Sequence, residues 1–112
     1  MEIELTGNDA VAVVAVSGRI DAYTAPEVEE RLMEAVRSGR GVVVDLSATD
    51  YVSSAGLRVL ITLAKRSMSD GFAMRLSGLQ EAVREVFEIA GFTKLFEIRD
   101  TRDAAVAELA AS

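Results

Sequence analysis

The first part of the chain shows the apolar pattern of two β-strands joined by a tight turn. Ile3 and Leu5 alternate with polar neighbours, and a second apolar run extends over residues 11–16. The Gly-Asn-Asp sequence at residues 7–9 is typical of turns, because these residue types tolerate sharp backbone bends. The pattern therefore predicts an N-terminal β-hairpin.

A first helix is expected over residues 25–38. Apolar side chains recur there at helical spacing and predict the inward face: Val28, Leu32, Ala35 and Val36. Thr24 and Glu27 have the spacing of a capping box, and Tyr23 is placed to form a hydrophobic staple with Val28. Gly39 is placed to end the helix, since glycine readily adopts the left-handed conformation.

A nearly all-apolar segment at residues 42–46 predicts a strand in the middle of the sheet. It has no polar face, which is typical of a parallel strand covered by helices on both sides. A second helix is expected next, with an apolar face made of five residues: Leu57, Leu60, Ile61, Ala64 and Met68. Gly71 is placed to end it.

The alternation of strand and helix then repeats. Residues 72–76 alternate as a strand, and Ser77 with Gln80 repeats the capping-box spacing ahead of a third helix. The apolar residues of that helix recur at helical spacing: Leu79, Val83, Val86, Phe87 and Ala90. Gly91 is placed to end it, and a short strand is expected around residues 95–98.

The last expected element is a helix over residues 102–110, capped by Asp100 or Thr101. Strands that alternate with short helices imply parallel pairing through right-handed crossovers, with the N-terminal hairpin as the antiparallel exception. The expected fold is therefore an α/β domain, in which about four helices pack on a mixed, mostly parallel β-sheet. A chain of 112 residues, half of them hydrophobic, fits one such domain over residues 1–112.

Composition excludes several classes of function. The chain has a net charge of −6 and contains neither histidine nor cysteine. The acidic balance argues against nucleic acid as a partner, and the lack of thiolate and imidazole ligands excludes the usual zinc, iron and copper sites. No cofactor is expected. The N-terminus does not read as a signal peptide and no apolar run approaches about 18 residues, so we expect a cytoplasmic protein without membrane contact.

Residues 45–57 read Asp-Leu-Ser-Ala-Thr-Asp-Tyr-Val-Ser-Ser-Ala-Gly-Leu and resemble the signature of STAS domains. This family includes bacterial anti-sigma factor antagonists and domains at the carboxyl ends of sulfate transporters. The Gly-Arg-Ile-Asp sequence that ends at Asp21 is similar to the family's Gly-x-Leu/Ile-Asp turn, and residues 90–92 resemble its late glycine turn. The resemblance extends over essentially the entire chain and implies the STAS fold.

The resemblance also implies a function in transcription control. In the family, a serine at the start of the second helix is phosphorylated by a partner kinase of the GHKL type, which is also the anti-sigma factor. The unphosphorylated antagonist binds this kinase and frees the sigma factor, and a PPM-type phosphatase resets the cycle. The expected function is therefore that of an anti-sigma factor antagonist and not of an enzyme.

The motif departs from its common form, Asp-Ser-Ser-Gly-Leu, at the start of the second helix. Aligned without a gap, the resemblance places the usual phosphoserine at Ala55, so the candidate phosphoacceptors are Ser54 and Ser53. A non-phosphorylated scaffold or signalling module is therefore the alternative function. The expected partner surface combines the loop of residues 50–57, the start of the second helix and the turn at residue 21: Asp21, Asp50, Tyr51, Ser53, Ser54, Ala55, Gly56, Leu57 and Arg58.

Structural roles compete with these functional ones. Serine is a preferred N-cap, so Ser53 or Ser54 could simply cap the second helix, and Asp21 could serve only to build a turn. Asp45 is expected to fix the following loop by accepting backbone amides, and Tyr51 to set that loop by packing. A Ser-His-Asp triad is excluded because the chain contains no histidine, and nothing in the sequence favours a Ser-Lys pair with Lys65 or Lys94. No phosphate-binding glycine motif occurs.

Overall fold

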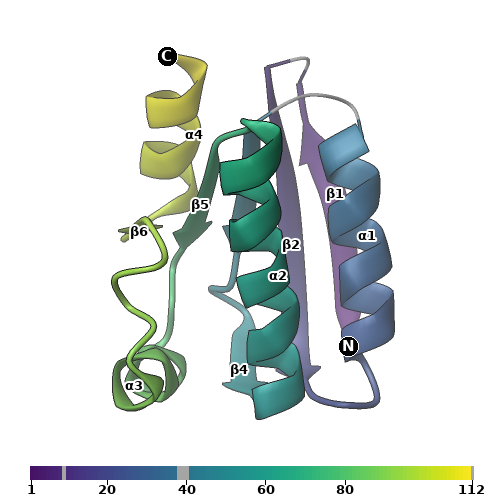
Figure 1. The fold of residues 1–112 in the computed structure, drawn as a ribbon, viewed down its shortest axis with the longest axis vertical. Helices are drawn as coiled ribbons and strands as arrows, with labels where there is room; N and C mark the ends of the chain where they lie inside the picture. The colour runs from purple at the N-terminus through teal and green to yellow at the C-terminus, as the bar shows by residue number, and fades with distance from the viewer. Residues whose placement is uncertain (9, 38–40, 112) are drawn as a thin grey trace.

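The computed structural model describes residues 1–8, 10–37 and 41–111 (Figure 1). Its strands are β1 (Glu2–Gly7), β2 (Val11–Ile20), β3 (Gly41–Asp45), β4 (Thr49–Val52), β5 (Met74–Ser77) and β6 (Ile98–Arg99). Its helices are α1 (Ala25–Arg37), α2 (Ser54–Asp70), α3 (Glu81–Ala90) and α4 (Arg102–Ala110). The expectations for Asp9, Ser38 and Gly39 lie outside the described residues.

The sheet confirms the expected mixed, mostly parallel topology. Its order is β1-β2-β3-β5-β6, in which β1 pairs antiparallel with β2 and the other neighbours pair in parallel. β2 is long enough to serve two partners on the same side, because residues 11–15 pair with β3 and residues 18–20 pair with β4. The last residues of β2 therefore lie beside β4.

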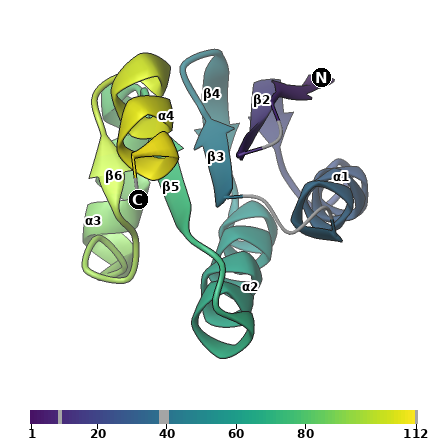
Figure 2. The same ribbon diagram turned by 90° about the horizontal axis from the view of Figure 1, so that it is seen from above.

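Helices cover both faces of the sheet (Figure 2). α1, α2 and α3 lie on one face, and α4 lies on the other. Val14 and Val44 belong to the main core, whereas Val13 and Val43 pack with residues of α4. This burial on two sides explains why β3 shows no polar face in the sequence.

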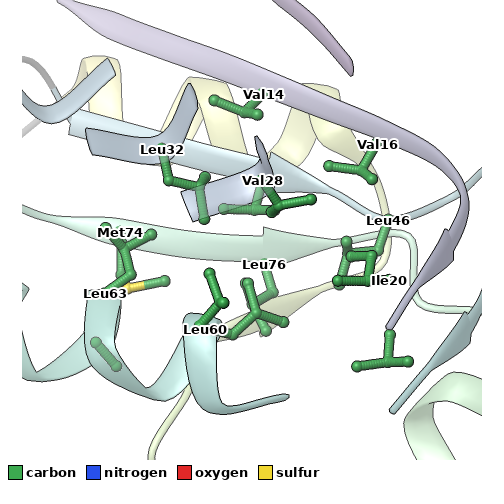
Figure 3. Close-up of a cluster of buried hydrophobic side chains, with 14 of the residues drawn as sticks. Val14, Val16, Ile20, Val28, Leu32, Leu46, Leu60, Leu63, Met74 and Leu76 are labelled. Atoms are coloured by element: carbon green, nitrogen blue, oxygen red, sulfur yellow. The ribbon is translucent and has the colours of Figure 1, made fainter. Parts of the chain in front are cut away.

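The main core fills the space between the sheet and the helices α1 and α2 (Figure 3). Residues from strands, helices and connections meet there: Val14, Val16, Ile20, Val28, Leu32, Leu46, Leu60, Leu63, Met74 and Leu76. Each fully buried aliphatic side chain of this kind contributes about 1.5–3 kcal/mol to stability. The core thereby fixes the end of β2 and the start of α2 relative to each other.

The main difference from the expected elements is β4, which lies within the stretch that the sequence presented as a loop. Thr49 and Val52 are buried, whereas Asp50 and Tyr51 between them are exposed. The Thr49 hydroxyl donates a 2.7 Å hydrogen bond to the Val16 carbonyl, which stabilises the start of the strand. A four-residue strand with an aspartate and a tyrosine at its centre shows no regular alternation of polar and apolar residues, so the sequence pattern does not distinguish it from a loop.

The capping box and hydrophobic staple expected at the start of α1 are wrong. The Thr24 hydroxyl accepts from the Asp21 N–H at 3.0 Å and donates to the Arg19 carbonyl at 2.9 Å, so it is engaged away from the helix. Tyr23 is 96% exposed and therefore forms no staple with Val28. The turn before α1 is organised by the Asp21 side chain instead.

The second expected capping box, ahead of α3, is also wrong. Ser77 lies in β5, and the Gln80 side chain donates a 3.0 Å bond to the Ser47 carbonyl instead of capping the helix. Met68, expected on the inward face of α2, is 68% exposed. The expected cap of the last helix is confirmed, because the Thr101 hydroxyl accepts a backbone N–H of its first turn at 3.1 Å.

Ion pairs hold α4 against its face of the sheet. Arg102 donates to the Asp45 carboxylate at 2.8 Å through Nε and lies 2.6 Å from it through Nη2. Glu108 accepts from both Arg75 and Arg99, at 2.9 Å for the Arg99 Nε bond. These contacts connect α4 to the three strands β3, β5 and β6.

Acid is expected to weaken the docking of α4. Hydrogen bonds from Arg99 and Arg75 lower the pKa of Glu108 from 4.5 to about 2. Because the folded state has the lower pKa, the stability from Glu108 is present above about pH 4.5 and is lost as the pH falls toward about 2. Asp45 acts in the same direction: burial raises its pKa, but bonds from a backbone amide and from Arg102 lower it overall.

Amide-exchange protection factors in α4, measured by NMR from about pH 5 down to about pH 2, check this expectation. Protection in the wild-type chain should fall over this range. Glu108→Gln should begin with weaker protection and lose less of it, because the group whose pKa is lowered is gone. The same loss of protection in both proteins would contradict the assigned role of Glu108.

Candidate partner-binding surface

The sheet end that carries β4 brings the expected partner residues together. β2 and β4 both end there, and α2 begins directly after β4 (Figure 1). The Ser53 N–H donates a 2.8 Å hydrogen bond to the Ile20 carbonyl and so ties the junction of β4 and α2 to the end of β2. Ser53 is extended, with φ −83° and ψ 176°, and the helix starts at the next residue.

Ser53 is the N-cap of α2, as its structural interpretation predicted. Its hydroxyl accepts from the Gly56 N–H at 3.3 Å, and its carbonyl accepts from the Leu57 N–H at 2.8 Å. The first of these bonds satisfies an amide that has no partner within the helix. The hydroxyl of this half-buried serine is therefore engaged in holding the start of the helix.

Ser54 is the first residue of α2 and the more accessible of the two serines. It is exposed, and its hydroxyl forms no hydrogen bond with the residues that the structure describes. Ala55 is half-buried and lines a shallow depression between α1 and α2. No acidic side chain stands in the first turn of α2, so the positive end of the helix dipole has no side-chain counter-charge there.

Gly56 and Leu57 belong to the packing of this region and not to its exposed surface. Both are buried, and Leu57 is only 6% exposed. A Cβ atom on Gly56 would lie 2.6 Å from the Ile20 carbonyl oxygen and 2.7 Å from Ile20 Cγ2. Glycine is thus required for α2 to begin so close to the end of β2. These two residues position Ser54 without themselves facing solvent.

Asp21 builds the turn between β2 and α1. Its Oδ1 atom accepts from the N–H groups of Tyr23 and Thr24 at 3.0 Å and 3.2 Å. The Arg19 Nε atom lies 3.7 Å from its other oxygen. The bond from the Thr24 amide lowers the pKa of Asp21 most, burial opposes it, and the Tyr23 amide and Arg19 add to the lowering. The turn role is confirmed, and the charged carboxylate remains partly exposed.

Tyr51 lies under a cation from the neighbouring strand. The Arg19 Cζ atom is 4.1 Å from the centroid of the Tyr51 ring, and the two residues are partners in the register of β2 and β4. Such a contact contributes about 0.5–1 kcal/mol at an exposed site. Tyr51 remains 40% exposed, and Asp50 beside it is exposed as well. An aromatic ring and two charged groups therefore border the start of α2.

Tyr23 is a surface residue that the sequence assigned to packing. Its backbone N–H is bound by Asp21, so its 96% exposed side chain projects from an ordered turn. Seven residues line the nearby depression between the two helices: Ala22, Ala25, Pro26, Glu29, Ala55, Arg58 and Val59. Exposed tyrosine is frequent at the centres of protein interfaces. The position of Tyr23 two residues after Asp21 is a sequence signal for an exposed turn residue, but its spacing from Val28 fits a buried hydrophobic staple equally well.

The described residues show neither a membrane-spanning helix nor a metal-binding cluster. None of their helices is both long and apolar enough to cross a membrane. The same residues include no group of three or more acidic side chains placed to hold a metal ion. The surface around Ser54 exposes two tyrosine rings and two arginine side chains, which are residue types enriched at protein interfaces.

A family model matches nearly the whole chain. It is the model described as STAS domain, and the match extends over residues 2–105. The chain belongs to the STAS domain family. This STAS domain is 37% identical over 108 residues to BtrV of Bordetella bronchiseptica. The aligned residues cover 96% of the chain and 93% of the relative.

Two further proteins similar to this STAS domain are named as anti-sigma factor antagonists. The anti-sigma-B factor antagonist of Listeria monocytogenes is 33% identical over 102 residues, which cover 89% of the chain and 90% of the relative. The crystal structure of an anti-sigma factor antagonist from Mycobacterium paratuberculosis has a TM-score of 0.88 at 28% identity, covering 97% and 93% of the two chains. Both names describe regulatory binding proteins, and the expected STAS fold is confirmed.

Proposed function

We propose that this STAS domain is an anti-sigma factor antagonist that binds its anti-sigma factor through the Ser54 surface. We define this surface by its exposed or partly exposed residues: Arg19, Asp21, Tyr23, Asp50, Tyr51, Ser54 and Arg58. One observation carries the proposal: Ser54 presents an exposed, unbonded hydroxyl at the start of a helix fixed against β2 and β4. The named function of a relative with 33% identity supports this class of partner.

The proposed anti-sigma factor is a serine kinase of the GHKL type that phosphorylates Ser54. The hydroxyl oxygen forms a bond to the γ-phosphorus of ATP, the bond from that phosphorus to the oxygen of the ADP leaving group breaks, and the hydroxyl proton leaves to a base or to water. The phosphoryl group carries about −1.5 to −2 charge at neutral pH. The helix start favours this charge, so phosphorylation alters the surface without unfolding α2. A PPM-type phosphatase returns the serine by hydrolysis.

The geometry favours Ser54 over both neighbouring positions as the acceptor. Modification of Ser53 would disturb the N-cap bond, whose loss costs about 1 kcal/mol. Position 55, where the resemblance places the usual phosphoserine, is half-buried in the depression between α1 and α2. The Ser54 hydroxyl neither forms a capping bond nor is half-buried. The alanine at position 55 is therefore compatible with a phosphorylation switch one residue earlier.

The proposed function is tested with a complex of the cognate anti-sigma factor kinase and its fluorescently labelled sigma factor. Addition of the unphosphorylated STAS domain is expected to release the sigma factor, which lowers its fluorescence anisotropy. The domain should also form a complex with the kinase alone. If the domain neither binds the kinase nor releases the sigma factor, the proposed function is wrong.

Tyr23→Ala is expected to weaken binding to the anti-sigma factor by about 30-fold, the loss typical of an interface hot spot of about 2 kcal/mol. Because Tyr23 is 96% exposed, its replacement should change the free energy of unfolding by only about 0.5 kcal/mol or less. Calorimetric titration with the kinase measures the affinity. Met68→Ala, which removes a 68% exposed apolar side chain elsewhere on α2, is the control and should bind normally. If Tyr23→Ala binds the kinase as tightly as Met68→Ala does, Tyr23 is not part of the binding surface.

A further inference from the structure

Arg58 lies one helical turn after Ser54 on α2. Residues at positions i and i+4 of a helix are neighbours on one face, with Cβ atoms about 5–6 Å apart. Long side chains in helices lean toward the N-terminus, which directs the Arg58 side chain to the turn that carries Ser54. Both residues are exposed. A group added to the Ser54 hydroxyl is therefore within reach of the Arg58 guanidinium.

The Arg58 guanidinium is available for a new partner. Six arginines of the described chain form ion pairs: Arg19, Arg31, Arg66, Arg75, Arg99 and Arg102. Arg58 forms none with a carboxylate that the structure describes, although Glu29 lines the same depression. Arg19, the other cation of the Ser54 surface, is already stacked on Tyr51. Arg58 is thus the cation of this surface that is free to pair.

We propose that Arg58 is the phosphate-binding residue of the switch, whose guanidinium pairs with the phosphoryl oxygens once Ser54 is phosphorylated. The inference rests on the proposed function, since it describes what the chain does with the phosphoryl group placed there. An acidic group four residues before a basic one is the favourable order on a helix. The planar guanidinium can donate two parallel bonds to phosphate, and such charge-assisted bonds are about twice as strong as neutral ones.

Pairing with Arg58 gives phosphorylation two effects on the Ser54 surface. The phosphoryl group adds negative charge, and it also withdraws the guanidinium that the unphosphorylated chain presents beside the depression. A partner that contacts Arg58 loses that contact at the same time as it meets the new charge. The switch therefore changes more than the charge of one side chain, although α2 itself stays folded.

The test is a ³¹P NMR titration of the chain carrying phosphoserine at position 54, installed during translation so that no kinase is needed. The second pKa of the phosphate is expected to be lower in the wild-type chain than in Arg58→Gln by on the order of half a unit. Arg58→Lys, which keeps the charge but not the planar fork, should fall between the two. Lys65→Gln removes an exposed cation two turns further along α2 and should titrate as the wild type does.

Equal phosphate pKa values in the wild-type chain and Arg58→Gln would overturn the inference. Circular dichroism of each phosphorylated protein establishes that α2 is folded, so that a lost pair is not mistaken for a lost helix. Because the phosphoserine is installed without the kinase, this result would leave the proposed antagonist function standing. A kinase that fails to bind the chain would instead overturn the proposed function.

Discussion

Ser54→Glu is expected to weaken the affinity of the STAS domain for its anti-sigma factor by about 30-fold or more, which corresponds to about 2 kcal/mol. The substitution places a negative charge on a surface that already carries Asp21 and Asp50, and it faces a partner that fits an uncharged serine. An acidic side chain in the first turn of a helix is itself stabilising. The loss should therefore appear in binding and not in the free energy of unfolding.

Calorimetric titration of the anti-sigma factor with matched variants separates charge from size. Ser54→Gln has nearly the size of the glutamate variant without its charge and should lose much less affinity. Ser69→Glu adds the same charge near the other end of α2, at an exposed serine, and should bind as the wild type does. Wild-type affinity for Ser54→Glu would show that the Ser54 surface is not the binding surface.

Gly56→Ala is expected to lower the free energy of unfolding by about 1–3 kcal/mol, as overpacking in a core does. In an open helix the same change would be stabilising by about 1 kcal/mol, since glycine is a poor helix former. Here the added Cβ would lie 2.6 Å from the Ile20 carbonyl oxygen, so β2 or α2 must move. That carbonyl also accepts the Ser53 N–H, and its displacement would disturb the junction before Ser54.

Urea denaturation of Gly56→Ala measures this loss, with Ser54→Ala as the neighbouring control. Ser54→Ala changes an exposed residue whose hydroxyl forms no bond to the described chain, so its stability should stay within about 0.5 kcal/mol of the wild type. The Ser53 amide signal should shift in the NMR spectrum of Gly56→Ala. A Gly56→Ala chain as stable as the wild type would contradict the close packing of α2 on β2.

The arrangement of the main elements follows from apolar periodicity. The uninterrupted valines of β3 require cover on both sides, and the helical spacing in α1, α2 and α3 supplies the helices for the main core. The amphipathic pattern predicts these elements correctly because the burial of apolar area dominates their stability. The mixed sheet, the N-terminal hairpin and the four helices could therefore be predicted without tertiary information.

The hydrogen bonds of polar side chains are less predictable, because the spacing of residue types does not decide which partner a polar side chain binds. Thr24 has the spacing of a cap, but it bonds the backbone of Arg19 and Asp21 across the turn. Thr49 anchors β4 to Val16, a residue 33 positions earlier in the chain. Only the fold brings such groups together, which is why the sequence pattern predicts a loop where β4 lies.

Some features of the candidate site could also be predicted from the sequence, whereas others depend on the fold. The motif at residues 53–57 located the start of α2, and the capping role of Ser53 was among the interpretations of the sequence. The helical spacing already placed Leu57 on the apolar face of α2, but the sequence could not tell that Gly56 is buried whereas Ser54 is exposed, since that depends on how α2 docks on Ile20. The exposure of Tyr23 likewise depends on the turn that Asp21 builds.

The central claim is that Ser54 is the phosphoacceptor of an anti-sigma factor antagonist. The most direct measurement is incubation with the GHKL-type kinase and ATP, followed by intact-mass and peptide mass spectrometry of wild type, Ser54→Ala and Ala55→Ser. We expect one phosphoryl group on the wild-type chain, located on Ser54, and none on Ser54→Ala. An unmodified wild-type chain beside a modified Ala55→Ser chain would contradict the claim and identify a partner-binding STAS domain without this switch.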